Sequence, residues 1–229
     1  MESAPGLYGS YASYKGYTTP KLGPKHMRRF EDDIWRPAQC DAGMSFLEVG
    51  CGTGAFLAFL GAKGVGRFLG IDHDPALADV VPPSVRGHFA CRDLREVVAD
   101  PAIEPFDRVV ALDVFEHFTA EDGTALLAAF RAKLSPQGRV VLKVPNAASP
   151  WGLSYQYGDL THRTAYTPLS LRQLADAAGF SVRLLVGQRQ GTRRRLFTDA
   201  LVHRFLSWAL LTPPEIWSAN LIAVLEPRP

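Results

Sequence analysis

The stretch at residues 48–54 has the sequence Glu-Val-Gly-Cys-Gly-Thr-Gly, and it decides the expected fold. The four residues before it, Met-Ser-Phe-Leu at 44–47, predict a short buried β-strand, and the apolar run Ala55–Ala62 after it predicts a helix. The glycines therefore occupy a strand-to-helix turn. Glycine has no Cβ, so the backbone can turn sharply there and a ligand can lie against it. The N-terminus of the following helix offers unpaired N–H groups on the same side of the turn.

Acidic residues follow the next predicted strands. Asp72 ends the predicted strand in the stretch Phe-Leu-Gly-Ile-Asp-His-Asp at 68–74, and Asp93 and Leu94 follow another short strand. In a doubly wound sheet, the acid after the second strand meets the two ribose hydroxyls of a nucleotide-type ligand. Asp93 can accept a hydrogen bond from the amino group of an adenine while Leu94 packs on the face of the ring. The fourth site is the stretch Phe106–Phe118, a predicted strand that ends in polar residues at the same edge of the sheet.

As a set, these motifs resemble those of the class I S-adenosylmethionine-dependent methyltransferases over about residues 40–180. The set comprises Glu-x-Gly-x-Gly-x-Gly, an acid after strand two, Asp-Leu after strand three and Asp-x-x-Glu-His after strand four. The resemblance implies an α/β, Rossmann-like fold: a seven-stranded, mostly parallel sheet with an antiparallel last strand and helices on both faces. It also implies S-adenosyl-L-methionine as cofactor and S-adenosyl-L-homocysteine as product. A nicotinamide-dependent oxidoreductase is the rival for the glycine motif, but it would more often show G-x-G-x-x-G/A.

The resemblance assigns roles to single residues. It places Glu48 near the methionine ammonium, the glycine backbone against the cofactor, Asp72 on the ribose and Asp113 near the methionine part. Cys51 is expected to pack rather than to react, because nothing near it argues for a lowered thiol pKa. The expected cofactor-binding residues are Glu48, Gly50, Cys51, Gly52, Gly54, Asp72, His73, Asp93, Leu94 and Asp113.

The expected catalytic residues are His117, His162 and Glu116. Methyl transfer from a sulfonium needs contact between acceptor and methyl carbon, exclusion of water and, for a hydroxyl acceptor, a base. His117 lies at the expected methyl-donor end, and histidine titrates near neutrality. Asp159 is close enough in sequence to orient His162, and Glu116 could orient His117 or bind a sugar hydroxyl. The structural alternatives are that His117 caps the following helix and that Asp159 and His162 only stabilise their loop. No metal is expected.

Residues 145–167 follow the fifth predicted strand and form the expected substrate loop. The expected substrate-binding residues are Trp151, Tyr155, Tyr157, Asp159 and Tyr166. The stretch 157–180 resembles bacterial methyltransferases of polysaccharide and other secondary biosynthesis, and Asp-x-x-Glu-His is similar to ubiquinone-type O-methyltransferases. Both resemblances imply an oxygen acceptor, such as a sugar hydroxyl of a glycan or lipid-linked saccharide. Two alternatives stay open: a quinone- or polyketide-like metabolite as acceptor, and a non-catalytic cofactor-binding module. A flat aromatic acceptor predicts an apolar pocket, whereas a glycan predicts a polar cleft with Trp and Tyr.

The chain divides into an N-terminal arm or lid with a helix (1–40) and a methyltransferase domain (41–229). The arm is rich in tyrosine, and a helix is predicted over Lys25–Arg36. A second helix is predicted over Ala120–Leu134, where a turn ending in a left-handed Gly138 stops it. The helical insertion 188–217 opens with three arginines and has apolar residues at helical spacing, which predicts an amphipathic helix. This helix packs on its own domain or a dimer mate, or residues 193–212 lie on a membrane surface.

Composition narrows the classes of partner. The net charge of +2 over 229 residues does not suggest a nucleic-acid partner. The three cysteines show no metal-ligand spacing and no disulfide framework, which fits a reducing cytosol. No leader sequence and no apolar run long enough for a membrane span is seen. The expected location is cytoplasmic, with peripheral contact to the inner membrane face as an option, and the expected partner is a small-molecule or glycan acceptor, with a homodimer left open.

Overall fold

The computed structural model describes residues 16–229, which form a seven-stranded sheet in the order β3-β2-β1-β4-β5-β7-β6. The strands are β1 (Phe46–Val49), β2 (Phe68–Asp72), β3 (Phe89–Cys91), β4 (Phe106–Leu112), β5 (Leu134–Pro145), β6 (Phe180–Gly187) and β7 (Asn220–Pro227). Strands β1 to β5 pair in parallel, and β7 runs antiparallel to both β5 and β6. The predicted α/β fold with an antiparallel last strand is therefore confirmed.

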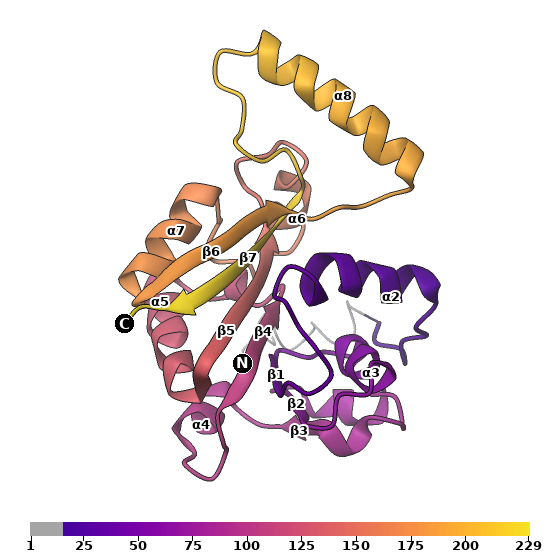
Figure 1. Cartoon of the computed structure of the whole chain (residues 1–229), viewed down its shortest axis with the longest axis vertical. Helices are drawn as coiled ribbons and strands as arrows, with labels where there is room; N and C mark the ends of the chain where they lie inside the picture. The colour runs from indigo at the N-terminus through magenta and orange to yellow at the C-terminus, as the bar shows by residue number, and fades with distance from the viewer. Residues whose placement is uncertain (1–15) are drawn as a thin grey trace, which may run out of the picture.

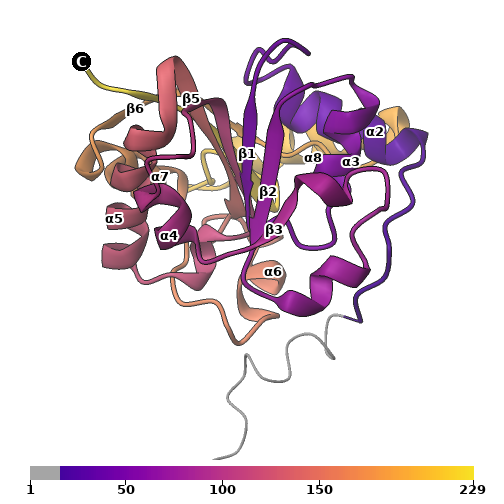
Figure 2. The ribbon, with the colours of Figure 1, turned by 90° about the horizontal axis from the view of Figure 1, so that it is seen from below.

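Helices cover both faces of the sheet (Figures 1 and 2). One face carries α2 (Pro24–Phe30) and α3 (Ala55–Ala62), and the other carries α4 (Leu94–Ala99), α5 (Ala120–Phe130) and α7 (Pro168–Ala177). Successive side chains of a strand point to opposite faces, so Val109 and Val110 of β4 enter different apolar clusters. Covered on both sides, the central strands are nearly continuous apolar runs. Two further helices, α6 (Leu153–Tyr157) and α8 (Arg193–Ala209), lie outside these layers.

The predicted helix over 120–134 is too long. α5 ends at Phe130, a short 3₁₀ turn follows, and Leu134 already pairs with Phe106 at the start of β5. Gly138 has no left-handed conformation; a Cβ at this position would lie 2.9 Å from Leu134 Cβ, so close packing requires the glycine. Left-handed glycines do follow two other helices: Gly64, with φ +76°, after α3 and Gly179, with φ +79°, after α7.

The segment before the glycine turn belongs to the core. The predicted helix over Lys25–Arg36 is α2 followed by a π-helical turn at Glu31–Trp35. Trp35 stacks on Phe46 of β1 with ring centroids 5.7 Å apart, and Phe30 packs against α3 through Phe56. The predicted tyrosine-rich arm falls largely on residues 1–15, outside the described part of the chain, so its role as a lid stays a prediction.

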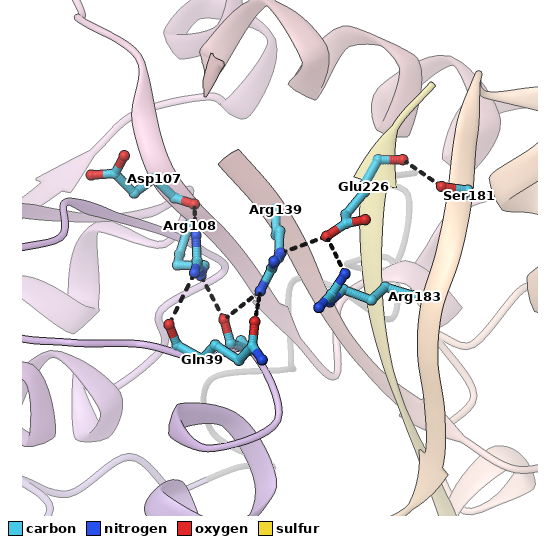
Figure 3. Close-up of polar contacts among 8 residues, drawn as sticks. Gln39, Asp107, Arg108, Arg139, Ser181, Arg183 and Glu226 are labelled. Atoms are coloured by element: carbon cyan, nitrogen blue, oxygen red, sulfur yellow. Dashed lines mark hydrogen bonds and ion pairs between the residues drawn. The ribbon is translucent and has the colours of Figure 1, made fainter. Parts of the chain in front are cut away.

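A polar network fastens this N-terminal segment to the amino-terminal edge of the parallel strands (Figure 3). Arg108 of β4 donates to the carbonyl oxygens of Ala38 and Gln39, at 3.0 and 3.1 Å, and Arg139 of β5 donates to the Gln39 side chain at 2.9 Å. Arg139 also reaches Glu226 of β7 at 2.8 Å. Because this edge is tied together by structural ion pairs, the opposite, carboxyl-terminal edge is left for a ligand.

Helix α8 extends beyond the end of the sheet at which β6 stops (Figure 1). Its polar side faces the body of the protein: His203 stacks on Trp217 at 4.9 Å and accepts a hydrogen bond from Trp151 Nε1 at 3.0 Å. Its apolar side chains face outward, with Phe205 60 % and Trp208 81 % exposed, and none of its residues is buried. Within the described residues, α8 therefore contacts its own domain through its polar side, and its apolar stripe is not covered by that domain. No helix within residues 16–229 has the length and hydropathy needed to cross a bilayer.

Candidate active site

The glycine turn connects β1 to α3 with backbone that only glycine adopts without strain. Gly50, Gly52 and Gly54 have φ values of +66°, +50° and +76°. A Cβ at Gly50 would lie 2.5 Å from Val114 Cγ2, whereas a Cβ at Gly52 would meet nothing within 4 Å. The turn is thus closely packed at Gly50 and open at Gly52, where a ligand can approach the backbone.

Asp72, at the end of β2, is fixed by the two loops around it. Its carboxylate accepts hydrogen bonds from the backbone N–H of Gly52 at 2.9 Å and of Asp74 at 3.2 Å. Each carboxylate oxygen has a second lone pair, so both can also accept from ribose hydroxyls. Asp93 caps α4 by accepting from the Arg95 N–H at 2.7 Å, which fixes it at the neighbouring strand end.

A cavity of about 1030 Å³ opens at this edge of the sheet. Among the predicted cofactor-binding residues, those that line it are Gly50, Gly52, Asp72, His73, Asp93, Leu94 and Asp113. The volume lies at the upper end of the range for ligand pockets. The cavity combines open glycine backbone, a carboxylate for the ribose and a second one beside an apolar side chain. These features fit an adenosyl compound.

The other three predicted cofactor residues do not line the cavity. Glu48 is 3 % exposed, and its Oε2 has no hydrogen-bond partner among the described residues. Burial raises the pKa of Glu48 well above its usual value, and the charge of Asp72 raises it further. Cys51 packs in the core on the α3 side, where burial raises its thiol pKa, and Gly54 is the N-cap of α3. Of these three residues, only Glu48 therefore has a buried polar atom without a hydrogen-bond partner among the described residues, next to the glycine turn.

A second cavity of about 430 Å³ adjoins the first, since Asp113 and His117 line both. Its lining residues are Arg29, Asp113, Glu116, His117, Lys143, Pro145, Ser154, Tyr155, Gly158, Asp159, His162, Gln190 and Asn220. Most of these side chains are charged or polar. A molecule here lies beside whatever the larger cavity holds, as methyl transfer between two bound molecules requires.

His117 lies in a 3₁₀ turn, Phe115–His117, directly after β4, and hydrogen bonds fix its ring. Thr161 Oγ1 donates to Asp159 at 2.6 Å and therefore accepts from His117 Nδ1 at 2.9 Å. The proton is thus on Nδ1, and Nε2 keeps its lone pair. The alternative in which His117 caps the next helix is wrong, because Thr119 is the N-cap of α5.

His162 faces His117, with ring centroids 4.7 Å apart in an edge-to-face arrangement. Its Nδ1 donates to the backbone carbonyl of Gln156 at 2.9 Å, since a carbonyl can only accept. Asp159 therefore orients His117 through Thr161, and its backbone carbonyl also accepts a hydrogen bond from the His162 N–H at 3.2 Å.

Glu116 places a carboxyl group beside the two histidines. It is 1 % exposed, and its Oε2 has no hydrogen-bond partner among the described residues. Burial raises the pKa of Glu116 to about 8, and the charge of Asp113 contributes in the same direction. The backbone carbonyl of Glu116 accepts from the N–H groups of Arg163 and Thr164 at 2.7 and 3.1 Å, which holds the substrate loop against the turn.

The predicted substrate residues divide into two groups. Tyr155 and Asp159 line the smaller cavity. Trp151 and Tyr157 are 50 % and 70 % exposed and line neither cavity, with Trp151 engaged by α8. The prediction that Tyr166 binds substrate is wrong. At 2 % exposure Tyr166 belongs to the apolar core, where burial raises the pKa of its hydroxyl.

Sequence reasoning missed Lys143 at the smaller cavity. Lys143 of β5 forms an ion pair with Asp113, whose backbone has the rare φ of +58° for a residue other than glycine. A lysine within the otherwise apolar run Val-Val-Leu-Lys-Val at 140–144 was the available signal, because a buried strand rarely carries a charge without a purpose. Arg29 of α2 also lines this cavity.

Comparison of the sequence with protein families and with known proteins identifies the family of this chain. A family model for a methyltransferase domain matches residues 22–185. Magnesium-protoporphyrin O-methyltransferase of Rhodobacter capsulatus is 32 % identical over 102 residues, which is 42 % of this chain and 40 % of that relative's length.

Solved structures share the fold at low identity. A SAM-dependent methyltransferase from Archaeoglobus fulgidus superposes with a TM-score of 0.66 at 17 % identity, covering 95 % of this chain and 98 % of that one. Magnesium protoporphyrin IX methyltransferase from Synechocystis PCC 6803, solved with bound SAH, superposes with a TM-score of 0.59 at 15 % identity. The match covers 95 % of this chain and 94 % of that one. The family model and these structures accordingly indicate S-adenosylmethionine as the cofactor. The chain therefore belongs to the methyltransferase-domain family, with the fold of the S-adenosylmethionine-dependent enzymes.

Proposed function

We propose that the chain transfers a methyl group from S-adenosylmethionine to a hydroxyl oxygen of a polyhydroxylated small molecule, such as a sugar of a glycan or lipid-linked saccharide. The new bond joins the acceptor oxygen to the methyl carbon. The sulfonium–methyl bond breaks, its electron pair goes to sulfur, and S-adenosylhomocysteine leaves. The hydroxyl proton must be removed, and Glu116, His117 and His162 surround the place where this occurs.

The observation that carries this proposal is the polar lining of the smaller cavity where it meets the larger one. Arg29, Lys143, Asp159 and Asn220 offer hydrogen-bond donors and acceptors at different sides of the cavity, and Tyr155 offers an aromatic face. A flat apolar ring would leave these groups without partners, whereas a sugar ring can satisfy them. The lining thus favours the polar acceptor over the quinone-like one.

An acceptor panel tests the proposal. The full chain is incubated with S-adenosylmethionine and, separately, with nucleotide sugars and simple glycosides, catechols and quinols, and a metalloporphyrin. Methyl transfer to sugar-containing acceptors is expected, at a kcat/KM at least about 10-fold above the aromatic ones, since each unpaired polar group costs about 1–3 kcal/mol. Faster transfer to a quinol or to the porphyrin would overturn the acceptor class. Binding of S-adenosylhomocysteine with no transfer to any member would favour the non-catalytic module.

We propose further that α8 attaches the protein to an anionic membrane surface, where a lipid-linked acceptor would be met. Its outward side chains include Phe197, Leu201, Phe205 and Trp208, all more than half exposed. The same helix carries Arg193, Arg194, Arg195 and Arg204 against one acid, Asp199. An exposed apolar face with an excess of arginine matches a surface of anionic lipid better than a second copy of the same basic helix.

Vesicle binding tests this attachment. The wild type is expected to sediment with phosphatidylglycerol vesicles and to show a blue shift of its tryptophan emission, but not with pure phosphatidylcholine. Changing Arg193, Arg194 and Arg195 to Gln should weaken binding about 100-fold, at about 1 kcal/mol per arginine. Trp208→Ser should weaken it as well, while Leu169→Ser, which removes a 75 % exposed leucine on α7, serves as the matched control. Equal binding by all variants, or a stable dimer lost on Trp208→Ser, would contradict the membrane proposal.

A further inference from the structure

Glu116, His117 and His162 gather three side chains of metal-binding type at the acceptor cavity. One ligand atom from each lies within 4.8 Å of the other two. They come from two segments, the 3₁₀ turn after β4 and the loop after α6, so the fold itself brings them together. In a metal complex such atoms are about 3 Å apart, so small side-chain movements complete the site.

The hydrogen bonds around the histidines prepare them as ligands. His117 is held through Nδ1 by Thr161, which Asp159 in turn holds, and His162 is held through Nδ1 by the Gln156 carbonyl. With both protons on Nδ1, both Nε2 atoms present a lone pair. At metal sites, a histidine usually binds the ion through one ring nitrogen and donates the N–H of the other nitrogen to a carboxylate, a backbone carbonyl or water.

The carboxyl of Glu116 supplies the third ligand and an independent reason for a cation. Its Oε2 is buried and has no hydrogen-bond partner among the described residues. A buried acceptor without a partner is energetically unfavourable, and a bound metal ion would remove this penalty. Two imidazoles and one carboxylate on one side of an ion suit first-row divalent metals and leave coordination positions open on the other side.

We propose that Glu116, His117 and His162 bind one first-row divalent metal ion, which holds two adjacent hydroxyl oxygens of the acceptor. This inference rests on the proposed O-methyltransferase function and narrows its substrate class to vicinal diols. The bound hydroxyl loses its proton more readily, as metal-bound water does. The proton passes to Asp113, which lines both cavities and is partly exposed, and then to solvent. The oxygen attacks the methyl carbon, and the metal does not change its oxidation state.

Metal binding is measured first without donor or acceptor. Chelator-treated wild type is titrated with Co²⁺ alone, followed by calorimetry and by the visible absorption of the bound ion. One Co²⁺ per protein chain is expected. The substitutions Glu116→Gln and His162→Gln should each weaken Co²⁺ binding at least about 100-fold. Thr161→Val, which leaves all three ligands in place, should weaken it about 10-fold through loss of the hold on His117. His26→Gln, at an exposed histidine of α2, is the matched control and should bind as the wild type does.

The second arm measures methyl transfer. Chelation should abolish transfer to a vicinal diol, Mn²⁺ or Co²⁺ should restore it, and the monodeoxy acceptor should be poor. S-adenosylhomocysteine affinity and thermal unfolding, measured on every variant, report whether the fold and cofactor site persist. Co²⁺ affinity equal in wild type and His162→Gln, or transfer that survives chelation, would overturn the metal site while leaving the proposed function intact. Absence of S-adenosylhomocysteine binding by the wild type would instead overturn the function itself.

Discussion

Replacing His117 by alanine is expected to lower kcat for methyl transfer by about 10²–10⁴-fold, the range for loss of a positioned group that handles a proton. His117 is the histidine that lines both cavities, and its ring is oriented through Thr161 and Asp159. The loss is expected whether Nε2 takes the acceptor proton directly or holds the metal ion. Calorimetric affinity for S-adenosylhomocysteine should change little, because Asp72 and Asp93, the predicted acceptors for the ribose hydroxyls and the adenine amino group, follow other strands.

Single-turnover rates of His117→Ala, with His26→Ala as the control, check this expectation. The control removes an exposed imidazole of α2 and should keep kcat within about two-fold, as surface changes usually do. A normal rate in His117→Ala would remove this residue from the mechanism and shift the chemistry to His162. A loss of cofactor affinity in parallel with kcat would show that the side chain supports the larger cavity instead.

The second large effect is expected for Asp72→Ala, which should weaken S-adenosylhomocysteine binding by about 100-fold or more. Two hydrogen bonds from ribose hydroxyls to a carboxylate are worth about 1.5–3 kcal/mol each. The same substitution also frees the N–H groups of Gly52 and Asp74, so the glycine turn loses a support. Both effects act on affinity for the donor rather than on the transfer step.

Titration calorimetry on Asp72→Ala and Asp72→Asn separates the two contributions. The asparagine keeps one acceptor oxygen for the loop N–H groups and should retain more affinity than the alanine. Asp79→Ala, at an acid in the following 3₁₀ turn that does not line the cavity, is the control. Affinity unchanged in Asp72→Ala would mean that the ribose is bound elsewhere.

The fold could be predicted because local signals and tertiary requirements agree. Glycines at 50, 52 and 54, followed by an apolar helix, admit few conformations other than a strand-to-helix turn. The acids at the ends of β2 and β3 then lie at one edge, since parallel strands share their carboxyl ends. Helix boundaries were less predictable: Leu134 continues the apolar spacing of α5, but pairing with Phe106 draws it into β5.

The acceptor side was predictable only in part. The Asp-x-x-Glu-His run identified Glu116 and His117, and the loop composition identified Asp159 and His162. Which group orients which histidine depends on side-chain geometry at ångström scale, so the link from Asp159 through Thr161 to His117 could not be predicted from the sequence. Tyr166 resembled a ligand-binding aromatic by composition, but the packing of α5 and α7 places it in the core.

Helix α8 shows a different limit of periodicity. Apolar residues at helical spacing indicate an amphipathic helix but not what its apolar face contacts. In the structure, Trp151 and Trp217 contact the polar side of α8. Trp151 donates a hydrogen bond to His203 and Trp217 donates one to Ser207, so the apolar side of the helix faces outward. This orientation depends on contacts with Trp151, 52 residues from His203 in sequence, and with Trp217 in the loop after the helix, so the periodicity of α8 alone could not reveal it.

The central claim is that the carboxyl-terminal edge of the sheet holds an S-adenosyl compound next to the acceptor cavity. A crystal structure of the chain with S-adenosylhomocysteine tests it most directly. The claim predicts the adenine beside Leu94, the ribose hydroxyls on Asp72 and the sulfur at the boundary of the two cavities, facing Asp113 and His117. Density for the compound outside this cavity, or a sulfur that points away from His117, would contradict it.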